Sequence, residues 1–175
     1  LPDYIRKKRI PKFISQVAIT IIVETIEQNY MLDEVPYLKQ LLNYTTDKKS
    51  PDDRTVIRFA KCFNSLGEYQ TACEIIEDYI RGDKFLSSFT LSNIIEIMPY
   101  FNFEYAEKTL LQLLPRCEIE DENGYYIIKY LETVELIGTP ALKQTVKKEL
   151  ENRITLYQSD SSKFVDIERV LRTLS

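Results

Sequence analysis

The chain has 175 residues, of which 44% are hydrophobic, and its 27 acidic and 23 basic residues give a net charge of −4. This negative charge argues against broad nucleic-acid binding, because such binding needs a surface rich in Lys and Arg. The absence of His removes the commonest metal ligand and the usual general base near neutral pH, and a content of only four Gly residues favours helices over a turn-rich sheet.

The N-terminal part of the chain is a basic segment followed by apolar residues at helical spacing. Residues 1–12 carry five cations, which predict a solvated arm or, alternatively, a contact for nucleic acid or anionic lipid. A helix is expected from Phe13 to about Tyr30. Its inward residues are expected to be Ile14, Val17, Ala18, Ile21 and Ile22. The β-branched run 19–23 would also suit a strand, but the pattern is longer than a typical strand and has no partner strand.

The next helices have recognisable starts and stops. A second helix should begin after Asp33-Glu34 and end near Tyr44. Ser50-Pro51-Asp52-Asp53 offers a capping hydroxyl, a proline at the first helical position and acids at the positive end of the helix dipole. That helix should close at Leu66-Gly67, where Gly67 can adopt the left-handed conformation that ends helices, and its partner should run from Tyr69 to Arg81.

Similar signals continue to the C-terminus. Further helices are predicted before Pro99, over residues 105–114, after Asn123-Gly124, and from Pro140, with Thr139 as its cap. The expected domain organisation is a basic N-terminal arm over residues 1–12, a helical-repeat domain of about four degenerate helix pairs over residues 13–158, and a C-terminal capping helix over residues 159–175. The chain opens without Met, which suggests a removed targeting segment or a piece of a longer protein.

A nearly constant period connects these helix pairs. The interval from Leu38 to Ala72 equals the interval from Ala72 to Ala106, and Ala141 lies one position beyond a third equal step. Small or apolar residues thus begin each second helix, which is what the close approach of paired helices requires. A period of about 34 residues is typical of helical-repeat proteins.

The best-formed repeat, residues 54–87, resembles the tetratricopeptide repeat. Ala60, Phe63, Gly67, Tyr69, Ala72 and Ile76 match the small, aromatic, glycine, aromatic, alanine and large apolar positions of that motif. The next repeat keeps Phe103, Ala106 and Leu110, with Phe101 at the glycine position, and the third keeps Gly138 and Ala141. The resemblance implies an all-α right-handed superhelix of antiparallel helix pairs that binds other proteins.

Two other repeat families remain as alternatives. The pentatricopeptide repeat has a similar period and reads single-stranded RNA, but only Ser92 with Asp121 resembles one of its base-reading pairs. The matrix-side helical-repeat subunit of cytochrome c oxidase is similar in its helix pairs and acidic character, yet Lys61-Cys62 occupies the place of its paired arginines. These resemblances imply an organellar RNA-binding factor or a respiratory-complex subunit.

No catalytic, cofactor or metal site is predicted. The cysteines Cys62, Cys73 and Cys117 have no Cys-x-x-Cys spacing, and their number fits a reducing compartment such as the cytoplasm or the mitochondrial matrix. The longest apolar run, residues 17–23, is far shorter than the roughly 20 residues of a membrane span. The expected function is a non-catalytic scaffold or structural subunit that binds other protein subunits. The residues expected to contact the partner are Arg54, Arg58, Lys61, Asn93 and Lys129.

Overall fold

A computed structural model describes residues 10, 13–47, 52–81, 87–116, 125–156 and 171–172. Within these ranges the chain is all-α, with eight α-helices, three short 3₁₀ helices and no strand. The chain divides into two compact units, residues 1–82 and residues 83–175. The predicted all-α class is therefore confirmed, and the two units are described separately below.

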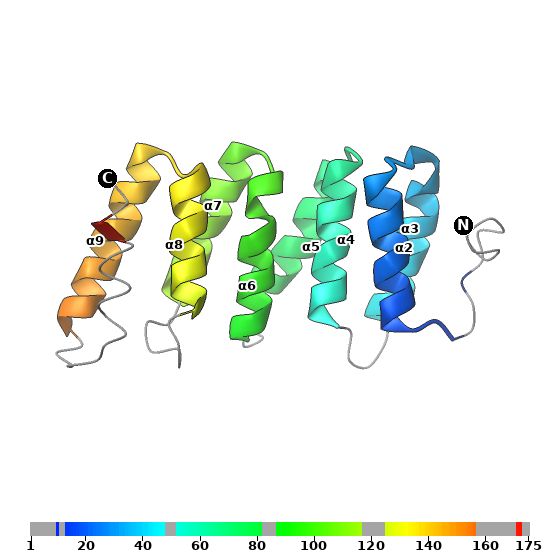
Figure 1. Ribbon diagram of the computed structural model, residues 1–175, viewed down its shortest axis with the longest axis horizontal. Coiled ribbons are helices and arrows are strands. Elements are labelled where there is room, and N and C mark those ends of the chain that lie inside the picture. The colour runs from blue at the N-terminus through cyan, green and yellow to red at the C-terminus, as the bar shows by residue number, and fades with distance from the viewer. Residues whose placement is uncertain are drawn as a thin grey trace. The chain divides into compact units, whose positions relative to one another are not determined.

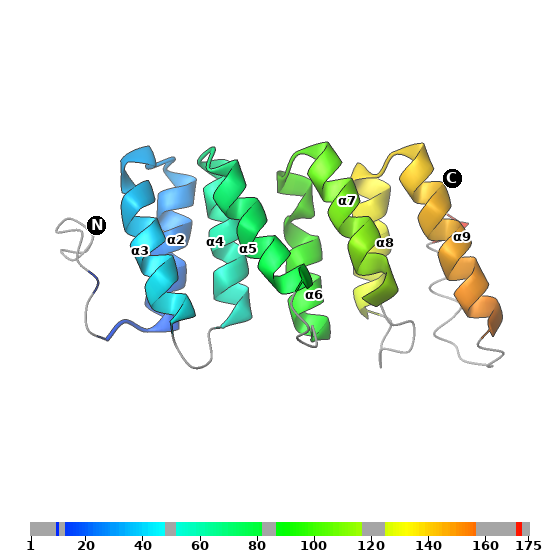
Figure 2. The same cartoon turned by 180° about the vertical axis from the view of Figure 1, so that it is seen from behind.

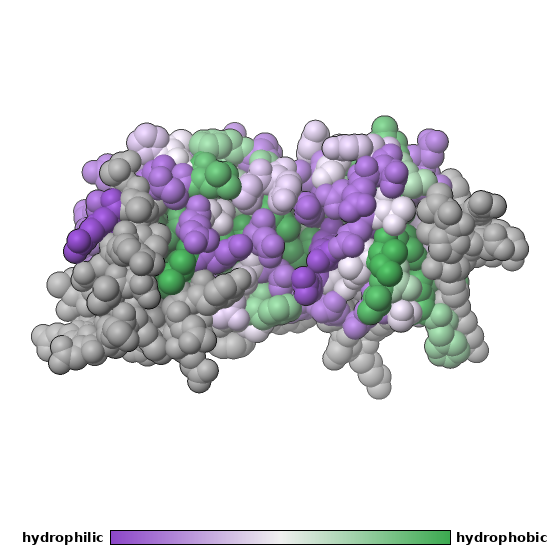
Figure 3. Space-filling model, in the orientation of Figure 1, coloured by the Kyte–Doolittle hydropathy of each residue, from purple (hydrophilic) through white to green (hydrophobic). Residues whose placement is uncertain are grey.

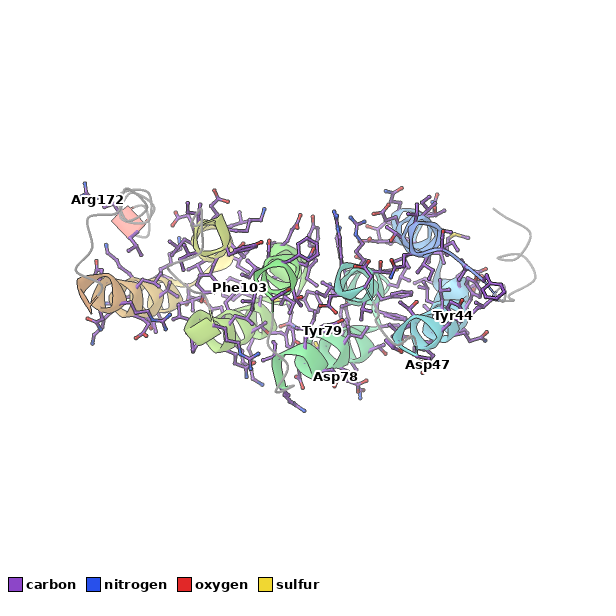
Figure 4. The ribbon with its side chains drawn as sticks, turned by 90° about the horizontal axis from the view of Figure 1, so that it is seen from below. Tyr44, Asp47, Asp78, Tyr79, Phe103 and Arg172 are labelled. Carbon is purple, nitrogen blue, oxygen red and sulfur yellow. The ribbon has the colours of Figure 1, made fainter. Side chains whose placement is uncertain are left out.

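Unit 1 contains two helix pairs. Its helices are α2 (Gln16–Gln28), η1 (Leu32–Glu34), α3 (Val35–Thr46), α4 (Asp53–Ser65) and α5 (Tyr69–Arg81). The two α-helices of each pair run in opposite directions, and α2 lies beside α4 (Figures 1 and 2). The view along the helices shows α2 and α4 in one layer and α3 and α5 in the other (Figure 4).

The core of unit 1 lies between these layers. It is built from apolar side chains of all four α-helices that are fully or almost fully buried: Ile22, Ile26, Leu38, Leu41, Phe59, Phe63, Ala72 and Ile76. The rings of Phe59 and Phe63 stack with their centroids 6.3 Å apart. Burial of such side chains is the main favourable term in holding a helix pair together, at about 1.5–3 kcal/mol for each large residue.

Side-chain caps define where α2 and α4 begin. The Ser15 hydroxyl accepts a hydrogen bond from the backbone N–H of Ala18 at 3.2 Å, so α2 starts at Gln16 rather than at Phe13. The Asp52 carboxylate accepts one from the N–H of Thr55 at 3.2 Å. The predicted cap Ser50 lies outside the described residues, and the capping role belongs to Asp52.

Both α2 and α4 end in the same backbone motif. Gly67, at φ +83°, donates its N–H to the Asn64 carbonyl, and Glu68 donates to the Phe63 carbonyl at 2.9 Å. Tyr30, at φ +48°, and Met31 make the equivalent two bonds at the end of α2. These are Schellman motifs, in which one left-handed residue satisfies the last helical carbonyls. The left-handed conformation predicted for Gly67 is confirmed.

Unit 2 also contains two helix pairs. Its helices are α6 (Ser88–Ile97), η2 (Met98–Tyr100), α7 (Phe103–Leu113), η3 (Leu114–Arg116), α8 (Tyr125–Ile137) and α9 (Pro140–Leu156). Within this unit, α6 and α8 form one layer and α7 and α9 the other (Figure 4). Thr139 caps α9 by accepting from the N–H of Leu142 at 3.2 Å, which confirms the predicted Thr139-Pro140 start.

One expectation for unit 2 is corrected. Ala141 was expected to make a close helix contact, but it is exposed and Leu142 is buried in its place, so the last interval of the period is one position longer than predicted. Tyr130 joins α8 to α7. Its ring is fully buried, and its hydroxyl donates to the Leu110 carbonyl at 2.8 Å.

The predicted terminal segments lie almost wholly outside the described residues. Of the predicted arm, the structure describes Ile10, and of the predicted capping helix it describes Leu171 and Arg172. Cys117 and the acidic stretch after it also lie outside. The domain boundaries at residues 12 and 158 therefore stay predictions.

Candidate functional site

Polar side chains connect α2 to α4 along their length, and each contact joins residues about one period apart in the sequence. The Arg58 guanidinium pairs with the Glu24 carboxylate, and Lys61 Nζ lies 3.5 Å from Glu27 Oε1. One turn earlier, the hydroxyls of Thr20 and Thr55 are 3.4 Å apart. Neighbouring helices that keep one offset along their length run parallel, in register.

Two further contacts join the same two helices, each between residues about one helical turn farther apart in sequence than the ion-paired residues. The Ser65 hydroxyl donates to Glu27 Oε1 at 3.1 Å, and the Cys62 thiol donates to the Val23 carbonyl at 3.6 Å. Burial and the nearby Glu27 carboxylate raise the pKa of Cys62 to about 12, while the positive charge of Lys61 acts against this rise. A thiol with so high a pKa is unreactive near neutral pH, which makes Cys62 a packing residue.

The cations of α4 form a row on its outward side. Arg54, Arg58 and Lys61 follow at intervals of four and three residues and therefore share one face of the helix. Arg58 and Lys61 are engaged by the carboxylates of α2. Arg54 is exposed and has no ion-pair partner within the described ranges. Among the described residues, Arg54 is thus the cation of this row that no ion pair engages.

An apolar row lies beside this cation row, on α2. Val17 and Ile21 are 70% and 57% exposed, and they lie seven and three residues before Glu24, on the same side of the helix. Figure 3 shows the apolar stripe over α2 next to the hydrophilic stripe over α4. We call this surface the α2–α4 face. It consists of Val17, Ile21, Glu24 and Glu27 from α2 with Arg54, Arg58 and Lys61 from α4.

The exposure of Val17 and Ile21 corrects the predicted inward face of α2. The buried residues are Ile14, Ile19, Ile22, Val23 and Ile26. The sequence around Ile19 is apolar on several sides of the helix, so the periodicity fits two faces. The packing of α4 against α2 leaves Val17 and Ile21 outside.

The other two predicted contact residues lie in unit 2. Asn93 is half-buried on α6, where its side-chain amide donates to the Phe89 carbonyl at 2.7 Å. Lys129 is half-buried on α8. Of the five predicted residues, Arg54, Arg58 and Lys61 are therefore brought together on one face, and Asn93 and Lys129 belong to other helices.

Sequence reasoning missed the role of the carboxylates on α2. One step of the period leads from Glu24 to Arg58, and the same step leads from Glu27 to Lys61, so the period itself held the signal for both ion pairs. The sequence offered no comparable signal for the exposure of Val17 and Ile21.

Tyr79 is a titratable residue of unit 1 that makes a structural contact between two helices. Its hydroxyl donates to the Asp53 carboxylate at 3.0 Å, which ties α5 to the first turn of α4. Burial and the negative charges of Asp53 and Asp52 raise the pKa of Tyr79 well above its usual range. Figure 4 labels Tyr79 next to Asp78 on α5. The pKa of Tyr79 is thus raised by its packing between α5 and α4 rather than by a catalytic arrangement.

Metal-binding clusters and membrane-spanning helices are absent from the described ranges. No cluster of three or more Cys, Asp or Glu side chains suited to a metal ion occurs there. In the same part of the chain, no helix combines the length and the apolar character that crossing a bilayer requires.

Comparison of this chain with protein-family models, with curated protein sequences and with solved structures gives no match. The α2–α4 face must therefore be interpreted from its own chemistry.

Proposed function

We propose that this chain is a non-catalytic helical-repeat protein that binds other protein subunits, as a scaffold or structural part of a larger assembly. The α2–α4 face carries the proposal, because it combines exposed apolar side chains, Val17 and Ile21, with the available cation Arg54 on two adjoining helices. Apolar residues together with Arg are typical of surfaces that bind proteins.

A stack of degenerate, tetratricopeptide-like repeats is the architecture we propose for this role. The common offset of the Glu24–Arg58 and Glu27–Lys61 pairs supports it, because equivalent positions of successive repeats then face each other. The complete burial of Leu38 and Ala72, which are separated by the same offset, is in agreement. The right-handed superhelix expected for such a stack is part of the proposal.

Protein is the favoured partner over RNA. RNA binding needs cations that can reach phosphates, and two of the three cations on this face already pair with carboxylates of the same chain. Val17 and Ile21 offer no hydrogen bond or aromatic stacking surface to a base. A reducing compartment, the cytoplasm or the mitochondrial matrix, is proposed because the three cysteines of the chain are an odd number without Cys-x-x-Cys spacing.

Affinity recovery of the tagged chain from cells, followed by identification of both proteins and RNA, tests the proposal. We expect a defined set of proteins with the unaltered chain and their loss with Arg54→Glu. The matched control is Arg81→Glu, which reverses another exposed arginine, on α5 in the other layer of unit 1. Recovery of RNA in a salt-sensitive manner, with no protein that depends on Arg54, would replace the proposal with the RNA-binding alternative.

A further inference from the structure

We infer that the α2–α4 face holds an amphipathic helix of a partner protein, with acidic side chains along one edge of its apolar stripe. This inference rests on the proposed function and specifies the kind of segment that is bound. Its starting point is the pair Val17 and Ile21, which are one helical turn apart and lie 70% and 57% open to solvent. A partner helix with apolar residues at intervals of three and four can cover both.

The charges beside this apolar pair determine whether the partner helix should carry acidic or basic side chains. Arg54 lies level with Thr20 of α2, because the next residue of α4, Thr55, contacts the Thr20 hydroxyl at 3.4 Å. Thr20 is next to Ile21 in sequence, so Arg54 lies level with the apolar pair. The face carries three cations and two carboxylates. Glu24 and Glu27 are already paired with Arg58 and Lys61, so the charge of Arg54 is not balanced on this face. A carboxylate on the partner would therefore be complementary to Arg54, and an ammonium group would be repelled.

The dimensions of the face suit one helix. From Val17 to Glu27 it extends about 15 Å, at 1.5 Å per residue, and neighbouring helices such as α2 and α4 are spaced about 8–10 Å apart. About three turns of a partner helix fill this length. A stable interface between two whole proteins buries about 800 Å² on each side, which is more than a face of this size offers to a second copy of the chain.

Designed helical peptides test the inference with the full chain. The first probe is a short side-chain-stapled peptide, just long enough to cover the face as a helix, with Leu along one side and Glu beside it. The second probe, the Lys peptide, has Lys in place of Glu. The third, the Pro peptide, has the sequence of the first with a central Pro and no staple, so that it cannot form the helix. Binding is followed by NMR of the Val and Ile methyl groups, with Val17 and Ile21 assigned by substitution. We expect the Glu peptide to shift both methyl signals, and the Lys and Pro peptides to bind at least tenfold more weakly.

Charge reversal on the protein provides a reciprocal test. Arg54→Glu should weaken the Glu peptide about tenfold and strengthen the Lys peptide, while Arg81→Glu should change neither. Equal affinity for the Glu and Lys peptides would overturn the inference, as would equal binding of the Pro peptide. Methyl shifts at Val17 and Ile21 that depend on protein concentration alone would identify a second copy as the occupant and would also overturn it. If cellular partners depend on Arg54 but no helical peptide binds, the proposed function stands and this inference alone fails.

Discussion

Glu24 of α2 and Arg58 of α4 form an ion pair between helices that are one period apart in the sequence, and Glu27 and Lys61 repeat the same interval one turn later. The two pairs hold the outward sides of α2 and α4 together. They also balance the positive charges of Arg58 and Lys61 with carboxylates of the same chain. The part of the face that we propose for partner binding is therefore the apolar pair Val17 and Ile21 with Arg54.

A double-mutant cycle should detect the Glu24–Arg58 pair. The side chains of Arg58 and Glu24 are 32% and 39% exposed, so we expect a coupling energy of only about 0.2–1 kcal/mol, as for other solvent-screened pairs. Glu24→Arg or Arg58→Glu alone should lower the free energy of unfolding, and the double swap should restore part of it. Urea unfolding followed by circular dichroism measures this. Strictly additive losses in the double swap would contradict the interaction.

Tyr30 and Gly67 occupy equivalent positions in the two Schellman motifs, and substitutions at these positions should have opposite effects on stability. Tyr30 holds φ +48°, a conformation that costs an L-residue about 1 kcal/mol and that glycine adopts freely. Because its ring is 70% exposed, little packing is lost on removal. Tyr30→Gly should therefore raise the free energy of unfolding by about 1 kcal/mol.

Gly67→Ala is the matched test in the other motif. A Cβ at Gly67 meets no atom within 4 Å, so the cost at φ +83° is the backbone strain alone, about 1 kcal/mol. Thermal unfolding of both variants checks the pair of predictions. A stabilising Gly67→Ala or a destabilising Tyr30→Gly would show that the two helix ends do not adopt this conformation.

Gly138 in unit 2 is restricted by space rather than by its backbone angle. A Cβ there would lie 2.5 Å from the Val134 carbonyl oxygen, and this oxygen also accepts the Gly138 N–H at 2.7 Å. Gly138→Ala should therefore lower the free energy of unfolding by about 1–3 kcal/mol, as overpacking does. Thr139→Ser keeps the capping hydroxyl of α9 and should change stability by less than about 0.5 kcal/mol. Similar stabilities for the two variants in urea would rule out the close contact.

The buried thiol of Cys62 predicts a loss of stability at alkaline pH. An unfolded cysteine loses its proton above a pKa of about 8.5, whereas burial raises the pKa of Cys62 to about 12. Above the lower value the unfolded state binds fewer protons than the folded state, so stability falls as pH rises between the two. Below about pH 8 both states are protonated, and Cys62 contributes no pH dependence.

Urea midpoints measured from pH 7 to pH 9.5 test this prediction. The fall above pH 8 should be shallower for Cys62→Ala than for the unaltered chain. The range stops at pH 9.5 because Tyr79, whose pKa is also raised, adds a slope of the same sign at higher pH. Equal slopes for the two proteins would mean that Cys62 titrates alike in the folded and unfolded states.

The sequence predicted the elements of the fold that depend on local chemistry. The α5 helix runs from Tyr69 to Arg81 as expected, because Gly67 ends the helix before it. Thr139-Pro140 begins α9 for similar local reasons. The prediction was wrong for Val17 and Ile21, where an apolar run fits two faces of one helix. The packing of α4 against α2 determines which face of α2 is buried, and this packing depends on residues that are distant in the sequence.

The partner-contact role of Arg54, Arg58, Lys61, Asn93 and Lys129 stays a prediction. The structure shows that Arg54, Arg58 and Lys61 share one outward face of α4. Their different contacts could not be predicted from α4 alone, since Glu24 and Glu27 belong to α2. Reading the period across both helices would have found these two partners.

Site-specific photo-crosslinking in cells tests most directly whether the α2–α4 face binds a partner protein. A benzophenone amino acid is placed at Ile21 or, as a control, at Tyr69, which is 60% exposed at the start of α5. We predict a discrete protein adduct from position 21 that disappears with Arg54→Glu, and no such adduct from position 69. Equal adducts from both positions, or an RNA adduct alone from position 21, would contradict the assignment of this face to a protein partner.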